Sequence, residues 1–232
     1  MSRPRRPLIP RRDPDAGPGG FGRLLVALLG AFAVQGISPT GTVAQVVVTG
    51  LLAITLLLSL MAADASPKVI QAGVIVASAV MALSVVQAIG GEVDGAATRL
   101  ANTVLVVLAP PAVVIGVVRH LRHTNRVSVE TVFGALCLYL LIGMFFAFIY
   151  GAIDKLGSDF FANGQAASVA HCIYFSFTTL ATIGYGDFTA ATNVGHTLSI
   201  TEGLIGQVYL VTIVAVIVSN LGREREPQDE RP

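Results

Sequence analysis

Hydrophobic residues along this chain gather into six long runs separated by short polar segments. The runs cover residues 24–37, 43–63, 69–91, 100–118, 131–153 and 194–221. A helix rises about 1.5 Å per residue, so about 20 apolar residues cross the roughly 30 Å hydrocarbon core of a bilayer. The first run is near the short limit and the others are long enough. The pattern therefore predicts an all-α integral membrane protein with six transmembrane helices.

A seventh stretch, residues 160–186, contains no Asp, Glu, Lys or Arg, but the distribution of positive charge argues against a seventh crossing. With six spans and both termini in the cytoplasm, 13 of the 15 Lys and Arg residues lie inside, and only Arg99 and Lys155 lie outside. An extra crossing would move three arginines of the C-terminal tail outside, against the positive-inside rule. We therefore expect residues 160–186 to enter the membrane from the outer side and to return to it.

Composition agrees with this topology. The chain is 53% hydrophobic and 12% charged, with a net charge of +1, whereas an ordinary soluble domain has about 25% charged residues. We expect a multi-pass protein of the cell (inner) membrane that does not bind nucleic acid. Cys137 and Cys172 both lie in apolar stretches and have no metal-binding spacing, so we expect them to be small buried residues.

The re-entrant stretch predicts a short helix followed by an unusual loop. Ser168 is a candidate N-cap for a helix over 169–180, which is too short to span a bilayer. The sequence Thr-Ile-Gly-Tyr-Gly-Asp follows at 182–187. Carbonyl groups of successive residues point the same way only if alternate residues take positive φ, which glycine tolerates. Gly184 and Gly186 stand at such alternate positions.

This hexapeptide resembles the selectivity filter of tetrameric potassium channels, in which backbone carbonyls replace the hydration shell of the ion. The resemblance extends in outline over residues 131–221, as an outer helix, a pore helix, a filter and an inner helix. It implies a four-fold homotetramer that conducts K⁺ passively, with no enzymatic activity and no cofactor besides K⁺ ions in the filter. The residues that would bind K⁺ through their carbonyls are Thr182, Ile183, Gly184 and Tyr185, and those that would shape the filter and its mouth are Gly186 and Asp187.

Two positions depart from the pattern of that family. Many members have tryptophans where this chain has Tyr174 and Phe175, and the N–H of the second tryptophan helps to anchor the filter aspartate. Phe175 has no donor, so Asp187 must find another partner or stay hydrated. Some members carry a glutamate at the position of Thr178, and a threonine cannot replace its charge. We therefore expect the outer end of the filter to be held in a different way.

The last hydrophobic run contains one acid, Glu202, and a glycine at the position of the family's inner-helix hinge, Gly206. If Gln207 lines the cavity, Glu202 faces the pore helix and the hydroxyls of Ser176 and Thr178, because residues five apart lie about 140° apart around a helix. Glu202 is then either a structural brace of the filter or a gate or proton sensor. Gly206 is either a gating hinge or a site of close helix packing. The residues assigned to filter support are Phe175, Thr178 and Glu202.

The segment 21–118 has the four-helix layout of a voltage sensor without its charges. The fourth run has no positive residue between Arg99 and Arg119, and two prolines interrupt it. Steep voltage dependence takes about 3–4 gating charges per subunit, so we expect weak gating by voltage or none. The linker 119–130 is expected to lie against anionic lipid through Arg119, Arg122 and Arg126. Residues 1–20, with five arginines and five prolines, are expected to form a disordered cytoplasmic tail, and 222–232 a short one.

Two alternatives stay open at this stage. A poorly selective cation channel would keep the same architecture, but filters that lose the aromatic residue tend to lose selectivity, and Tyr185 is present. A potassium-transport or accessory subunit could borrow the pore loop. Transporters of that type usually keep a single filter glycine and repeat the motif four times, whereas this chain has one motif with both glycines.

Overall fold

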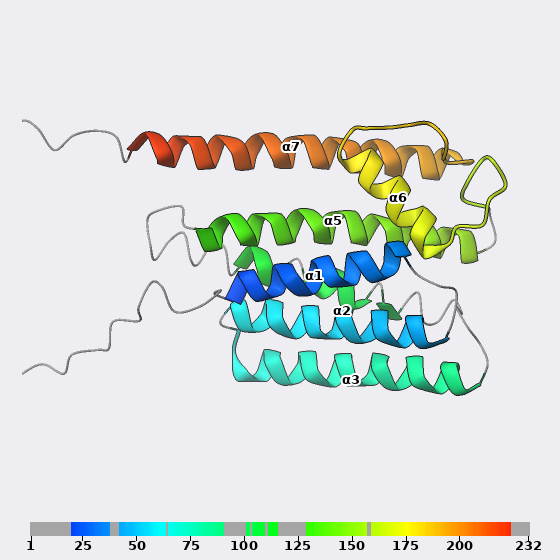
Figure 1. The fold of residues 1–232 in the computed structure, drawn as a ribbon, viewed down its shortest axis with the longest axis horizontal. Helices are drawn as coiled ribbons and strands as arrows, with labels where there is room; N and C mark the ends of the chain where they lie inside the picture. The colour runs from blue at the N-terminus through cyan, green and yellow to red at the C-terminus, as the bar shows by residue number, and fades with distance from the viewer. Residues whose placement is uncertain are drawn as a thin grey trace, which may run out of the picture.

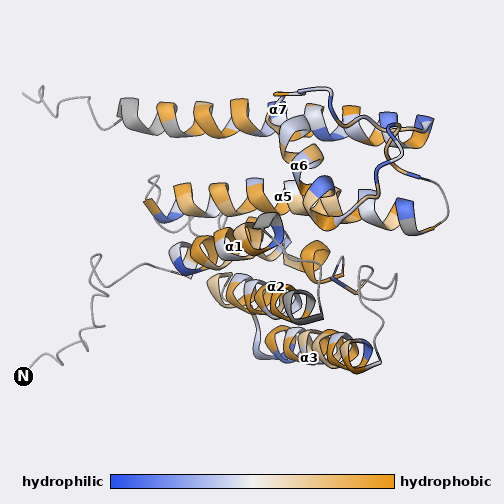
Figure 2. Cartoon of the chain, turned by 45° about the vertical axis from the view of Figure 1, so that its right-hand side comes forward, coloured by the Kyte–Doolittle hydropathy of each residue, from blue (hydrophilic) through white to orange (hydrophobic). Residues whose placement is uncertain are grey.

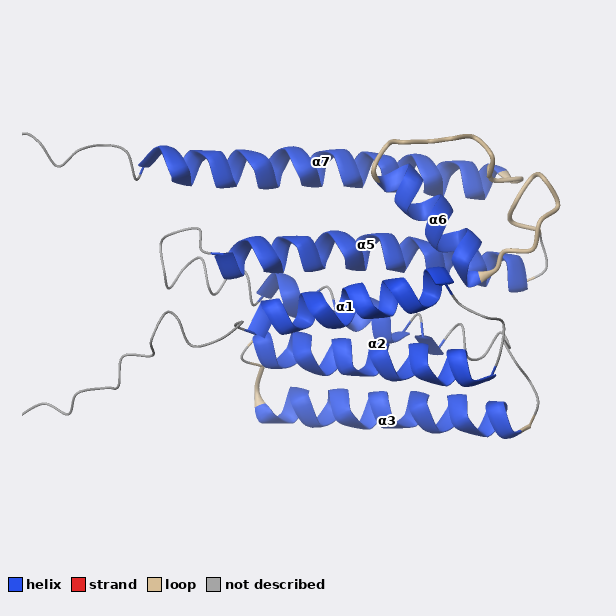
Figure 3. Ribbon diagram, viewed as in Figure 1, coloured by secondary structure: helices blue, strands red, loops and turns tan. Residues whose placement is uncertain are grey.

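The computed structural model describes residues 20–37, 42–63, 65–90, 101–102, 104–109, 111–115, 129–156 and 159–223. Its labelled helices are α1 (Gly20–Ile37), α2 (Thr42–Ala62), α3 (Pro67–Ile89), α5 (Val129–Lys155), α6 (Val169–Leu180) and α7 (Asn193–Arg223). Residues 101–102, 104–109 and 111–115 are also helical (Figure 3). Within these ranges the only β-type pairing is a single bridge between Phe161 and Ala190. The prediction of an all-helical chain is confirmed.

Helices occur at every hydrophobic run, and α6 has the predicted bounds. Three helical segments are long and apolar enough to cross a membrane, namely Pro67–Ile89, Val129–Asp154 and Asn193–Val216. The apolar helices Gly20–Gln35, Val46–Ala62 and Val104–Ile115 are shorter. Six crossings therefore stay a prediction, because the segments that would extend the shorter helices fall partly outside the described residues.

Several predicted features lie outside the part of the chain that the structure describes. These are the basic tail before Gly20, most of the basic linker, with Arg119, Arg122 and Arg126, and the tail after Arg223. The predicted contact between the linker and anionic lipid therefore stays a prediction.

The long helices are arranged side by side in the order α3, α2, α1, α5 and α7, and α6 crosses obliquely between α5 and α7 (Figure 1). Hydrophobic residues make up most of the length of the helices, and hydrophilic residues collect towards their ends and in the loops (Figure 2). Such a distribution is typical of helices that lie in lipid. The loop after α6 returns beside the N-terminal end of α7 (Figure 1).

Helix α1 attaches the first group of helices to α5 and α6. Near its start the Phe21 N–H donates to Glu130 Oε2 on α5 at 3.1 Å. Further along, the edge of Phe32 meets the ring of Phe177 on α6 at 4.8 Å between centroids. The Phe177 ring also lies directly on Gly143 of α5, where a Cβ atom would come within 2.6 Å of it. The position of α6 is therefore coupled to α1 as well as to α5.

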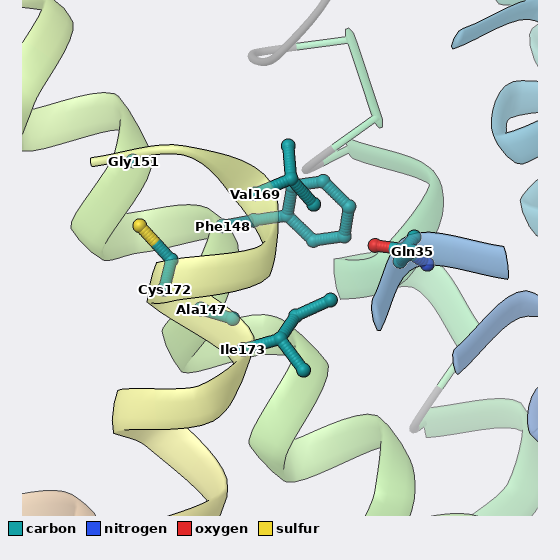
Figure 4. A pocket seen from close by; sticks show the side chains of 7 residues that line it. All are labelled: Gln35, Ala147, Phe148, Gly151, Val169, Cys172 and Ile173. Atoms are coloured by element: carbon teal, nitrogen blue, oxygen red, sulfur yellow. The ribbon is translucent and has the colours of Figure 1, made fainter. Parts of the chain in front are cut away.

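A small cavity of about 10 Å³ lies where α1, α5 and α6 meet. Gln35 of α1 reaches it, and the other lining residues come from α5 and α6 (Figure 4). Gln35 is fully buried, and its Nε2 donates to Ala31 O at 3.1 Å. Its Oε1 has no partner among the described residues. A cavity of this size is at the lower limit for one water molecule, and apart from Gln35 its lining is mostly apolar.

Candidate functional site

The short helix α6 leads the chain into the candidate filter. It begins as predicted, with the Ser168 side chain accepting the His171 N–H at 3.2 Å. One face of α6 is buried against the neighbouring helices, and its C-cap residue Ala181 donates its N–H to Phe177 O at 3.0 Å. A capped and packed helix of this length fixes where the following loop starts.

The loop has alternating left-handed backbone. The φ angle is 56° at Thr182, 54° at Gly184 and 82° at Gly186. The only other positive φ in the described part of the chain is at Gly164. The positive φ expected at Gly184 and Gly186 is confirmed. Thr182 continues the alternation, although a β-branched residue rarely takes positive φ, and such strained residues cluster at functional sites.

Thr178 holds the start of this loop through its backbone. Its carbonyl oxygen accepts the N–H groups of Ile183 at 2.8 Å and Gly184 at 3.2 Å. Its hydroxyl donates to Phe175 O at 3.0 Å, one turn back along α6. The Thr178 hydroxyl, which Glu202 was expected to face, is thus bonded within α6, as a threonine in a helix can bond to the carbonyl of the preceding turn. Thr178 contacts the filter through its carbonyl.

The C-terminal end of the loop is held by a residue to which the sequence pattern gave no such role. The Tyr174 hydroxyl donates to Asp187 Oδ2 at 2.9 Å. The Tyr174 ring is stacked on Tyr185, 6.2 Å away and 10° from parallel. In addition, Asn163 Nδ2 donates to Asp187 O at 3.1 Å. Asp187 thus has the alternative partner that the sequence required, and the signal for it was the hydroxyl that Tyr174 carries beside the donor-free Phe175.

The same contact affects the ionisation of Tyr174. Desolvation, followed by the hydrogen bond to Asp187 and the negative charge of Asp187, raises the pKa of Tyr174 above its usual range. A raised pKa keeps the phenol protonated over a wider range of pH. The donor to Asp187 is therefore present throughout the neutral range.

Phe175 supports the site by packing. It is 8% exposed and meets the rings of Tyr150, Phe160 and Phe161 edge to face, at 5.3, 5.8 and 5.6 Å. The segment that contains Phe160 and Phe161 is also bonded to the chain after the loop 181–187, because the Ala162 N–H donates to Thr189 O at 2.9 Å. This aromatic cluster joins α6 to the loops on both sides of it.

Glu202 of α7 is fully buried behind α6. Its Oε2 accepts the Tyr150 hydroxyl of α5 at 2.6 Å, and its Oε1 contacts Ser176 Oγ of α6. Ser176 Oγ in turn lies 2.7 Å from Gly143 O of α5. The predicted contact between Glu202 and Ser176 is confirmed, and Tyr150 is a further member that the sequence did not single out. One buried cluster thus connects three helices.

Gly206 lies where α7 crosses the end of α6. A Cβ atom at this position would lie 2.9 Å from Leu180 Cδ1, 3.2 Å from the Leu180 carbonyl carbon and closer still to its oxygen. The two helices approach this closely only because residue 206 has no side chain. The close-packing interpretation of Gly206 therefore has a definite partner, while its role as a hinge stays a prediction.

The loop 181–187 is exposed in the single chain, with Ile183 54% and Tyr185 69% accessible. No group of three His, Cys, Asp or Glu side chains within the described ranges is placed to bind a metal ion. The polar groups of the loop are its peptide carbonyls, the hydroxyls of Thr182 and Tyr185, and the Asp187 carboxylate at its end, which accepts the Tyr174 hydroxyl. A cation at this site would therefore be bound mainly by backbone oxygens.

Tyr174→Phe is expected to destabilise the C-terminal end of the loop 181–187, because the change removes the hydrogen bond to Asp187 and keeps the stacked ring. This hydrogen bond ties α6 directly to Asp187 at the end of the loop. If the loop lines a potassium pore, we expect the current through the variant to decay faster during sustained activation when external potassium is low. Tyr209→Phe is the matched control, since it removes a hydroxyl that donates to Ala135 O, away from the filter. Equal decay in Tyr174→Phe and wild type would contradict the role of this bond.

Comparison with known proteins assigns a function class to this part of the chain. Residues 134–223 match the family model described as "Ion channel". The matched segment contains most of α5, all of α6, the loop 181–187 and α7. No curated protein and no solved structure gives a significant match to the chain. The match supports ion-channel function, and together with the long apolar helices it indicates a membrane protein of transport rather than catalytic type.

Proposed function

We propose that four copies of this chain form a potassium-selective channel with a central pore lined by the carbonyl oxygens of Thr182, Ile183, Gly184 and Tyr185. The observation that carries the proposal is the left-handed backbone at Thr182, Gly184 and Gly186, three alternate residues of the Thr-Ile-Gly-Tyr-Gly-Asp sequence. That alternation turns successive carbonyls towards one side of the chain. One chain then supplies one wall of a cage in which a dehydrated K⁺ ion binds.

Packing around the loop supports selectivity for potassium over a smaller ion. Tyr185 stacks on Tyr174, whose hydroxyl is bonded to Asp187. The start of the loop is bonded to the Thr178 carbonyl. To bring its carbonyls equally close to the smaller Na⁺ ion, the loop would have to contract. A loop held by contacts at both ends resists this contraction, because closely packed protein resists compression.

Assembly of several copies is supported by the exposure of α7. Only 11% of the apolar stretch of α7 that could cross a membrane is buried within the chain, compared with 50% of the corresponding stretch of α5. Val208, Val211 and Val214 are 66%, 66% and 57% exposed. An exposed apolar helix beside an exposed filter loop fits a position next to a central axis. There, neighbouring copies of the chain would cover the helix, and the loop would line the pore.

The proposed orientation places the N- and C-terminal tails in the cytoplasm of a cell (inner) membrane, with six crossings. The loop 181–187 then opens towards the outside. The C-terminal end of α6 points into the membrane, and the negative end of its dipole faces a cation in the cavity below the filter. A cation is thereby stabilised at the depth where lipid solvates it least.

The proposal is tested with purified protein in planar bilayers that have KCl on one side and NaCl on the other. The expected reversal potential lies close to the potassium equilibrium potential, because Na⁺ gains too little from the carbonyl cage to replace its water. Equal permeability to both ions would leave an ion channel but reject potassium selectivity, in favour of a poorly selective cation channel. Potassium uptake without channel currents would favour a transport subunit.

The conductance is expected to change little between about −100 and +100 mV. Steep voltage dependence needs charges that move within the membrane, each of which contributes roughly 2.3 kcal/mol per 100 mV. Among the described residues before α5, the only Lys and Arg side chains are Arg23 and Lys68. Both lie in the first turn of their helices, so neither charge stands in the middle of a helix. Macroscopic conductance measured over a series of voltage steps checks this expectation, and a steep sigmoidal curve would contradict it.

A further inference from the structure

The buried cluster behind the pore helix has more hydrogen-bond contacts than its hydroxyl groups have protons. Ser176 Oγ contacts both Gly143 O and Glu202 Oε1. Tyr150 OH contacts Glu202 Oε2 at 2.6 Å. A serine or tyrosine hydroxyl carries one proton, and a backbone carbonyl can only accept. Three contacts between oxygen atoms therefore share two hydroxyl protons.

The position of each proton can be assigned from these contacts. The Tyr150 proton serves Oε2 of Glu202. Gly143 O has no proton, so the 2.7 Å contact requires the Ser176 proton. The remaining contact, between Ser176 Oγ and Glu202 Oε1, then needs a proton that only the carboxyl group can supply. An ionised Glu202 would instead leave two oxygen acceptors facing each other without a proton.

The charges around Glu202 agree with this assignment. From α5, Tyr150 bonds to it and Tyr139 lies within electrostatic range. From α6, Cys172 lies within electrostatic range of Tyr150. On α7 itself, the Ser199 side chain is hydrogen-bonded to Tyr150 and donates to Gly195 O at 2.8 Å. None of these groups carries positive charge. No cationic side chain of the described residues pairs with this fully buried acid, and a buried carboxylate without a positive partner is strongly unfavourable.

We infer that Glu202 is held as a neutral carboxylic acid which donates its proton to Ser176, and that this proton positions the pore helix between the outer and inner helices. Ser176 is two residues before Thr178, whose carbonyl holds Ile183 and Gly184. A shift of Ser176 therefore moves the start of the filter. Glu202 acts as a positioning residue through Ser176 and Thr178, and its effect on conduction rests on the proposed channel function.

Glu202→Gln is the informative variant. The glutamine amide has nearly the shape of a carboxylic acid, its NH₂ can donate to Ser176, and its carbonyl can accept from Tyr150. We expect the variant to assemble like wild type and to keep potassium flux within about twofold, because all three hydrogen bonds remain satisfied. Alkaline solution is expected to reduce wild-type flux when Glu202 ionises, and this loss should be absent from the glutamine variant. Ser176→Ala, which removes the bridge, should lose flux at every pH.

Infrared spectroscopy tests the proton itself, independently of conduction. The wild-type minus Glu202→Gln difference spectrum at neutral pH should contain the carbonyl-stretching band of a protonated carboxylic acid. Absence of that band would overturn the inference. If the glutamine variant failed to assemble, wild-type protein with ¹³C-labelled glutamate would serve, because an isotope-shifted acid band at neutral pH is expected and its absence would again overturn the inference. A channel that conducts no potassium but shows the band would reject the proposed function and leave the proton assignment standing.

Discussion

Gly184→Ala is expected to abolish potassium current while leaving an assembled protein. Gly184 has φ of 54°, and a Cβ atom added there would meet nothing within 4 Å in the single chain, so the effect is conformational rather than a clash. Left-handed backbone costs a residue with a Cβ about 1–2 kcal/mol, and the proposed tetramer would contain four such residues around one ion path. The carbonyls would leave the orientation that binds the ion, and we expect the current to fall by more than about 100-fold.

Gly164 offers a matched control in the same chain. Its φ is 70°, and a Cβ there also meets nothing within 4 Å, but it lies in the loop before α6. Gly164→Ala therefore carries a similar backbone cost without altering the filter, and we expect normal potassium currents. Bilayer recordings with size-exclusion chromatography of both variants separate conduction from assembly. Equal loss of current in the two variants would indicate that general instability explains the effect, and normal current in Gly184→Ala would contradict the proposed filter.

The helices and the position of the candidate filter were predictable because each depends on a local pattern. Runs of apolar residues long enough for a bilayer can hardly form anything but helices, and Ser168 marks the start of α6. Gly184 and Gly186 likewise signal their own backbone conformation, because glycine tolerates positive φ. In each case the information lies within a few residues of the feature that it determines.

The contacts that hold the filter could not be predicted in the same way. Thr182 takes positive φ against its own preference, so the surrounding hydrogen bonds and not its residue type impose that conformation. Tyr150 reaches Glu202 across 52 positions of sequence, and only the crossing of α5 with α7 brings them together. A tyrosine in an apolar run has many possible partners. The partners chosen by tertiary packing leave no local trace in a single sequence.

Gly206→Ala is expected to destabilise the assembled protein and to remove potassium flux. Alanine improves helix propensity by about 1 kcal/mol, but its Cβ would press on the backbone carbonyl of Leu180, which cannot rotate away. Overpacking of this kind costs about 1–3 kcal/mol in each chain. The end of α6 must then shift, and the filter begins two residues later. Thermal unfolding of the purified protein and potassium flux from vesicles measure the two effects.

Gly203→Ala is the control that separates packing from hinge bending. Residue 203 lies on the same helix less than one turn away, and a Cβ there would be 3.8 Å from Thr179 O, an ordinary contact. We expect this variant to conduct normally and to be as stable as wild type or slightly more so. If Gly206 is instead a hinge, Gly206→Ala should match Gly203→Ala in thermal stability and change only the fraction of time that the channel is open. A stable, selective Gly206→Ala channel with altered opening would therefore reject close packing at Leu180 as the reason for the glycine.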